Sequence, residues 1–189
     1  SPEELRRYAR LAREESMNDL AARSYSALLA LAPSDGEALR EAGKLAYAEG
    51  RYSEAAQLLA RADHDAESLL LLGDLAKREK REDEARRKWS LALAANENKM
   101  LEAQLLARLG RWDQASQLFG DLVAADPKDD GAKAEYASAL LDRGRLGDAE
   151  RVLKTGDAGL RLEQLRAQLA AVKGDTKSAS RQLTARSPP

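Results

Sequence analysis

Apolar residues recur along this chain at the three- and four-residue spacing of one helix face, without the alternation expected of a strand. Small residues add a longer period, because a glycine or alanine with an alanine twelve residues after it recurs at six regularly spaced places along the chain. These pairs are Ala9 and Ala21, Gly43 and Ala55, Gly73 and Ala85, Ala103 and Ala115, Ala137 and Ala149, and Ala167 and Ala179. Successive pairs start 34, 30, 30, 34 and 30 residues apart, which predicts stacked helix pairs.

A break lies between the two small residues of each pair. The stretches AEGRYSEA at 48–55, ARLGRWDQA at 107–115, DRGRLGDA at 142–149 and VKGDTKSA at 172–179 each read as a helix end, a glycine and a new helix start. Ser16 and Lys80 take the place of this glycine in the first and third repeats. We therefore expect about twelve helices, paired as six hairpins, and no strand.

The repeat resembles the tetratricopeptide repeat family, and the match is fullest in the second and fourth repeats. The matching residues there are Gly43, Gly50, Tyr52, Ala55, Leu59 and Ala62, and then Ala103, Gly110, Trp112, Ala115, Phe119 and Pro127. The resemblance implies an all-α, right-handed α-solenoid of about six helix-turn-helix repeats, starting near residues 2, 36, 66, 96, 130 and 160. It implies a single array over residues 1–186, with 187–189 as a linker or tail.

The charge balance limits the choice of partner. The 31 Lys and Arg residues are matched by 32 Asp and Glu residues, so the chain lacks the strongly cationic character of a dedicated nucleic-acid binder. The stretch KREKREDEARRKWS at 77–90 is locally basic, but its acidic residues offset much of that charge. We interpret it as a solvated turn followed by a helix with Trp89 in the core, and nucleic-acid binding through residues 77–88 is the distant alternative.

The sequence offers little material for catalysis or for a bound cofactor. It has no cysteine and a single histidine, His64, which lies between Asp63 and Asp65 and reads as a solvated turn rather than a metal site. The stretch DPKDDG at 126–131 lacks the alternating spacing of a calcium loop and reads as a lead-in to a helix. No phosphate loop or nucleophile motif is present, so we expect no enzyme activity, no cofactor and no metal.

A partner-binding groove is the function that the resemblance implies, since stacked helix pairs present a concave surface built from their first helices. The positions that line this groove in the family correspond here to Arg6, Arg10, Arg13, Arg40, Lys44, Tyr47, Leu70, Asp74, Lys77, Arg78, Met100, Gln104 and Arg108. They continue at Ala134, Ser138, Leu141, Gln164 and Gln168. The basic N-terminal part is expected to attract an acidic or carboxylate-bearing segment of another protein, although these arginines could equally lie over helix surfaces.

Three classes of function therefore stay open. A protein-binding scaffold is favoured, and the alanine- and arginine-rich style resembles bacterial proteins that help assemble secretion, pilus or exopolysaccharide-export machinery of the cell envelope. A structural spacer domain of a larger assembly protein is second, and nucleic-acid binding is third. We expect a soluble protein of the bacterial periplasm or cytoplasm, since no apolar run reaches the length of a membrane span. The sequence leaves partner identity and oligomeric state open.

Overall fold

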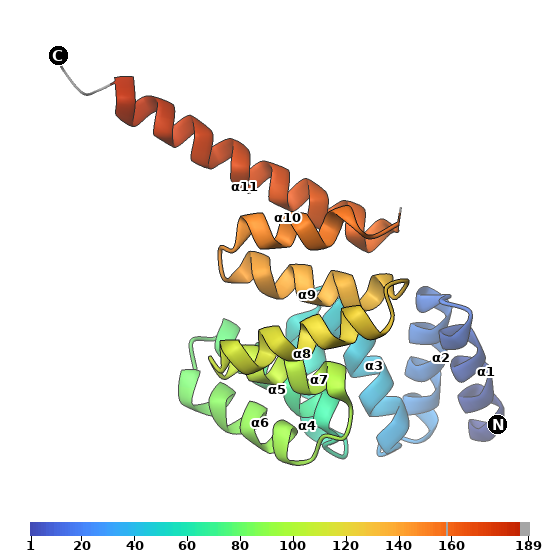
Figure 1. Ribbon diagram of the computed structural model, residues 1–189. Coiled ribbons are helices and arrows are strands. Elements are labelled where there is room, and N and C mark those ends of the chain that lie inside the picture. Colours follow the sequence, from blue (N-terminus) through green and yellow to red (C-terminus); the bar gives the residue numbers. More distant parts are fainter. Residues whose placement is uncertain (158, 186–189) are drawn as a thin grey trace. The chain divides into compact units, whose positions relative to one another are not determined.

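The computed structural model describes residues 1–157 and 159–185, with side chains to residue 174, and these residues form eleven α-helices and no strand (Figure 1). The first six are α1 (Pro2–Glu14), α2 (Asn18–Leu31), α3 (Gly36–Ala48), α4 (Tyr52–Arg61), α5 (Ala66–Arg78) and α6 (Glu82–Ala94). The others are α7 (Lys99–Arg108), α8 (Trp112–Ala125), α9 (Asp130–Asp142), α10 (Leu146–Lys154) and α11 (Leu160–Ala185). The expected tail at 187–189 lies outside the described residues.

The chain divides into two compact halves, Ser1–Asn96 and Glu97–Pro189. In the N-terminal half, α1 pairs with α2, α3 with α4 and α5 with α6, and the second helix of each hairpin packs on the first helix of the next. In the C-terminal half, α7 pairs with α8 and α9 with α10, and α11 packs against both α9 and α10. Five of the six expected hairpins are therefore present in the described part of the chain.

Every one of these five hairpins uses the same two devices to begin its helices. The first helices begin at a polar N-cap whose side chain accepts a backbone N–H, namely Ser1, Asp35, Asp65, Asn98 and Asp129. The second helices follow a residue in the left-handed conformation, which lets the next backbone N–H return to a carbonyl near the end of the first helix. These left-handed residues are Ser16, Gly50, Lys80, Gly110 and Gly144, with φ between 58° and 80°.

The sixth hairpin is not formed, and this prediction was wrong. The backbone of α11 continues through Gly174, where we expected a turn, and in Figure 1 it runs past the end of α10. Gly174 does not adopt the positive φ of the glycines at 50, 110 and 144. The sequence supplies a reason, because residues 176–185 carry only three apolar side chains and a second helix there would bury little apolar surface.

The paired small residues lie where two helices of a hairpin approach most closely. Gly43 and Gly73 are buried, as are Ala9, Ala103 and Ala137 at the same place in the other complete hairpins, and so is the alanine twelve residues later in each of these five hairpins. A Cβ atom on Gly43 would lie 2.7 Å from Cγ of Leu59, and one on Gly73 would lie 2.4 Å from Nε1 of Trp89. Ala167 in α11 is exposed, as expected when no second helix returns to cover it.

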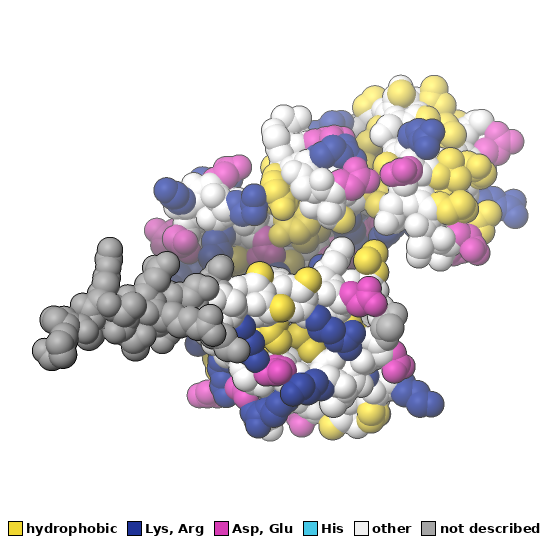
Figure 2. Space-filling view, turned by 90° about the horizontal axis from the view of Figure 1, so that it is seen from above, with side chains coloured by type: hydrophobic (Ala, Val, Ile, Leu, Met, Phe, Trp, Pro, Cys, Tyr) yellow, Lys and Arg dark blue, Asp and Glu magenta, His cyan; other side chains and the backbone are white. Residues whose placement is uncertain are grey.

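The locally basic stretch at 77–90 has the structure that we predicted. The turn between α5 and α6 contains Glu79, Lys80 and Arg81, all exposed, and Trp89 is 2 % exposed in the core. The Arg81 guanidinium forms ion pairs with both Glu79 and Glu84. Over the face drawn in Figure 2, Lys and Arg side chains likewise lie among Asp and Glu side chains.

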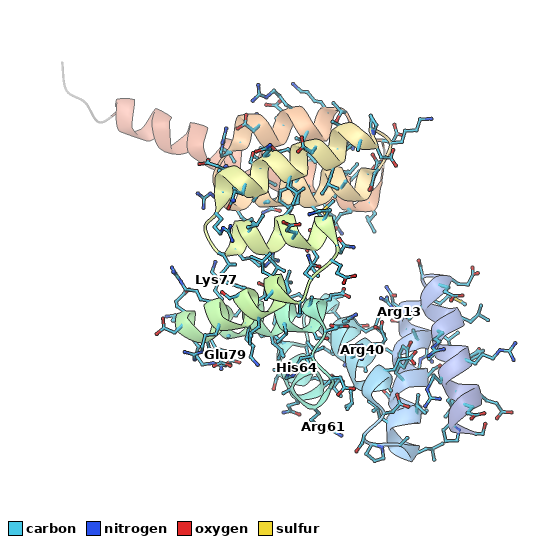
Figure 3. The ribbon with its side chains drawn as sticks, turned by 60° about the horizontal axis from the view of Figure 1, so that its bottom comes forward. Arg13, Arg40, Arg61, His64, Lys77 and Glu79 are labelled. Atoms are coloured by element: carbon cyan, nitrogen blue, oxygen red, sulfur yellow. The ribbon has the colours of Figure 1, made fainter. Side chains whose placement is uncertain are left out.

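The acidic stretch at 126–131 also has the expected role, because Asp129 accepts the backbone N–H of Ala132 at 2.9 Å and caps α9. His64 is exposed in the loop between α4 and α5 (Figure 3). Among the described residues, no group of three or more His, Cys, Asp or Glu side chains is placed to hold a metal ion. No helix of the described part combines the length and the apolar character that crossing a membrane requires.

Candidate functional site

The first helices of successive repeats lie next to one another within each half. In the N-terminal half α3 contacts α5 directly, and in the C-terminal half α9 contacts both α7 and α11. No comparably extensive contact joins the second helices α4 and α6, or α8 and α10, within the described residues. The first helices therefore form the closer-packed side of each stack, which is the side that family resemblance assigns to partner binding.

A regular series of ion pairs crosses from each first helix to the next repeat in the N-terminal half. Between α1 and the next repeat the pairs are Arg6 with Asp35, Arg10 with Glu37, and Arg13 with Glu41. Between α3 and the next repeat they are Arg40 with Asp65 and Lys44 with Glu67. We call these ten residues the ion-pair ladder; Arg13 and Arg40 are labelled in Figure 3.

Lys44 and Arg10 each make more than one polar contact within the ladder. The Lys44 ammonium lies 2.5 Å from a carboxylate oxygen of Glu67 and 3.2 Å from one of Glu41, and only 14 % of the Lys44 side chain is exposed. Arg10 donates from Nε and from an Nη nitrogen to the two carboxylate oxygens of Glu37, a bidentate arrangement. The ladder thus orients consecutive first helices through charge-assisted contacts.

The pKa shifts of the ladder follow from these contacts. The hydrogen bond from Arg6 holds the pKa of Asp35 below its ordinary value, and the hydrogen bond from Arg10 does the same for the pKa of Glu37. Burial opposes the charged form of Lys44, but its hydrogen bond to Glu67 and the nearby carboxylates leave its pKa raised. Each of these pKa shifts favours the charged form of its group, so Asp35, Glu37 and Lys44 stay ionised at neutral pH.

The ladder corrects our expectation of a positive groove in this region. Its five cations are matched by five carboxylates, so the summed positive potential expected from Arg6, Arg10, Arg13, Arg40 and Lys44 is largely offset. The carboxylates were missed as members of the site. A signal for them exists in the sequence, because an acidic residue recurs at the N-cap and at the second helical position of the second and third repeats.

Beyond the ladder, Tyr47 and Asp74 belong to a polar and aromatic cluster. The Tyr47 hydroxyl lies 3.5 Å from one carboxylate oxygen of Asp74, and Nε1 of Trp89 donates to the other at 3.1 Å. The ring of Tyr47 also contacts the ring of Tyr52 edge to face, with the two ring centres 5.5 Å apart. Leu70, which we placed in the groove, is only 4 % exposed; its side chain is part of the core and is not available to a partner.

Lys77 and Arg78 differ from the ladder cations because neither forms an ion pair within the described structure. Both are exposed at the end of α5, where Figure 3 labels Lys77 and Glu79. The guanidinium of Arg78 stacks 3.8 Å from the ring centre of Tyr52, and the Lys77 ammonium lies 5.8 Å from the ring centre of Trp89. Tyr52 was recognised in the sequence as a residue of the repeat pattern, and its contact with a groove cation was missed.

In the C-terminal half the expected groove residues are less charged. Met100, Gln104 and Arg108 of α7 are half-buried, and the Gln104 amide donates to Glu135 of α9 at 2.8 Å. Further along, Ser138 and Leu141 are half-buried and Gln164 and Gln168 are exposed, whereas the expected groove residue Ala134 is 1 % exposed and lies in the core.

Comparisons with known proteins agree with this architecture. Two family models, each described as a tetratricopeptide repeat, match residues 7–66 and 106–172, which together make up more than half of the chain. The chain belongs to the tetratricopeptide repeat family. No curated protein sequence matches it.

Solved structures with the same fold come from several bacteria. A tetratricopeptide repeat protein from Parabacteroides merdae is 18 % identical with a TM-score of 0.60, and the match covers 92 % of this chain and 72 % of that one. TTC0263 from Thermus thermophilus is 18 % identical with a TM-score of 0.61, over 90 % and 98 % of the two chains. Pseudomonas aeruginosa pilF is 18 % identical with a TM-score of 0.52, over 95 % and 89 %. The predicted fold class, an all-α solenoid of tetratricopeptide repeats, is thus confirmed.

Proposed function

We propose that this chain is a non-enzymatic scaffold that holds a segment of a partner protein on its first helices. The observation that carries the proposal is the exposure of that face. Of the expected groove residues from Arg6 to Arg108, all except Leu70 are half-buried or exposed, although their helices are closely packed. The fold of this family supports protein–protein interaction. The first helices of this chain carry polar and aromatic side chains that are accessible to a partner.

The chemistry of the partner is a narrower part of the proposal. An acidic or carboxylate-bearing segment suits the exposed cations of the first helices, since guanidinium groups bind carboxylates in bidentate geometry. The offset charge of the ladder reduces this attraction near α1 and α3, so the cations at the end of α5 carry most of it. The assembly context, a bacterial secretion, pilus or export machinery of the cell envelope, rests only on sequence style.

Affinity capture with paired variants tests the scaffold role. The purified chain is immobilised, exposed to a lysate of its source organism, and compared with Lys77→Trp, which places a bulky ring on the first-helix face. Arg87→Trp is the matched control, because Arg87 is exposed on a second helix. We expect a partner retained by the wild type and by Arg87→Trp and lost from Lys77→Trp, with equal melting temperatures.

Two results contradict the proposal. If the wild type retains nothing beyond what an unrelated helical protein retains, the chain is not a scaffold of this kind under these conditions. If both tryptophan variants retain the same partner equally well, that partner uses a different face of the molecule.

A further inference from the structure

A hollow of about 440 Å³ lies at the end of α5, between the second and third repeats of the N-terminal half. Its lining consists of Tyr52, Leu75, Arg78 and Glu79. Leu75 is 3 % exposed and Tyr52 is half-buried, so the apolar part of the lining belongs to the folded core and needs no rearrangement. The hollow therefore combines a preformed apolar floor with one guanidinium at its wall.

The charges around the hollow are unevenly compensated. Glu79, the carboxylate among the described lining residues, lies 2.6 Å from an Nη nitrogen of Arg81, which also pairs with Glu84, so the charge of Glu79 is partly offset. Arg78 and its neighbour Lys77 have only aromatic contacts among the described residues, at Tyr52 and Trp89. A positive charge therefore remains at the rim of an apolar hollow.

The contact with Tyr52 holds the Arg78 guanidinium over an aromatic ring, and no hydrogen bond or ion pair within the described residues occupies its N–H groups. These donors are therefore open to a ligand, and the aromatic contact orders part of the side chain before a ligand arrives. A carboxylate can then accept two parallel N–H bonds from the guanidinium. The ladder arginines do not offer this, since their donors already face carboxylates of the next repeat.

A related contact occurs in the C-terminal half. Trp112 begins α8 as Tyr52 begins α4, and the exposed Arg143 lies 5.2 Å from its ring centre, at the end of the next first helix. Both pairs join the aromatic residue that opens a second helix to an arginine near the end of the following first helix, but Arg78 is the last residue of α5, whereas Arg143 follows α9 one repeat position later.

We propose that the hollow formed by Tyr52, Leu75 and Arg78 binds an acidic residue of a partner protein together with the apolar side chain next to it. The carboxylate pairs with Arg78 under the added potential of Lys77, and the apolar side chain rests on the half-buried ring of Tyr52, beneath which Leu75 belongs to the core. This inference rests on the proposed scaffold role, and it moves the recognition of acidic segments from the N-terminal arginines to the end of α5.

A labelled peptide tests the hollow even while the natural partner is unidentified. The probe is a short fluorescein-labelled peptide of alternating leucine and glutamate, and its affinity for the full chain is measured by fluorescence anisotropy at low salt. We expect Arg78→Gln to weaken binding about tenfold, because one charge-assisted bidentate contact is lost. Arg87→Gln, with the same change of charge on an exposed residue of α6, should change the affinity less than about twofold.

Three further results decide between the alternatives. Equal binding of a peptide with glutamine in place of glutamate would overturn the proposal, because the carboxylate would then contribute nothing. Equal weakening by Arg78→Gln and Arg87→Gln would overturn it in favour of unspecific charge attraction. Single-stranded DNA that binds more tightly than the peptide, and loses affinity in Arg78→Gln, would assign the site to nucleic acid instead.

The outcome can be separated from that of the scaffold proposal. If the chain captures a partner through its first-helix face but does not bind the acidic peptide, the hollow is wrong and the scaffold stands. If the peptide binds through Arg78 while no partner is captured, the hollow is supported and the scaffold role fails.

Discussion

Replacing Gly73 by alanine should destabilise the N-terminal half, although alanine is the better helix former. A Cβ atom at this position would lie 2.4 Å from Nε1 and 2.5 Å from Cδ1 of Trp89, distances that real Cβ contacts do not show. The indole cannot easily move aside, because it is 2 % exposed and donates to Asp74. The distance between α5 and α6 must therefore increase, or the indole must lose its hydrogen bond to Asp74.

The expected magnitude follows from three opposing contributions. Alanine gains about 1 kcal/mol over glycine in a helix interior. Overpacking of a filled core costs about 1–3 kcal/mol, and a buried donor left without its acceptor costs about 1–3 kcal/mol more. We therefore expect Gly73→Ala to lower the free energy of unfolding by about 2 kcal/mol, which corresponds to roughly 4–8 °C in melting temperature for a chain of this size.

Denaturant unfolding followed by circular dichroism measures this change, with Gly120→Ala as the matched control. Gly120 lies inside α8, and a Cβ atom there would have no heavy atom within 4 Å, so alanine should raise stability by about 1 kcal/mol. In a Trp89→Leu background, where the indole is gone, Gly73→Ala should no longer be destabilising. The reasoning is refuted if Gly73→Ala alone is as stable as the wild type or more stable.

Three further predictions concern the core, a turn and the ladder. Ala55→Asp should destabilise the fold by at least about 3 kcal/mol in thermal melts, because a carboxylate would replace a side chain that is 0 % exposed; a melting temperature close to that of the wild type would contradict this. Lys80→Gly should raise the free energy of unfolding by about 1 kcal/mol, whereas Lys80→Ala should change it little. Lys80 has a φ of 62°, and only glycine adopts this conformation without strain. Equal unfolding midpoints for the two variants would contradict this prediction. The hydrogen bond from Arg10 lowers the pKa of Glu37, so the stability from this pair is present above the unfolded carboxyl pKa of about 4.3 and is lost as pH falls through the lower folded pKa. The free energy of unfolding, measured from neutral to acidic pH, should therefore fall less steeply in Glu37→Gln than in the wild type. An unchanged slope would refute the assignment.

The sequence by itself determined the repeat and most of its hairpins. The recurring pairs of small residues predict two helices in close approach, and the five pairs that belong to the complete hairpins, from Ala9 and Ala21 to Ala137 and Ala149, are all buried. Polar N-caps and turn glycines are local signals, since each acts through backbone groups a few residues away. The burial of Trp89 followed from its place in the repeat, so the basic stretch before it could be assigned to a turn.

Only the tertiary structure decided the charge of the surface and the end of the array. Whether Arg10 faces solvent or Glu37 depends on how consecutive repeats are aligned, and a distance between residues 27 positions apart cannot be read from local pattern. The same holds for Arg78, whose stacking on Tyr52 in place of a carboxylate distinguishes it from the ladder. The glycine at 174 illustrates the limit of local signals: a glycine permits a left-handed turn, but a turn forms only where the helix that follows has a surface to pack against.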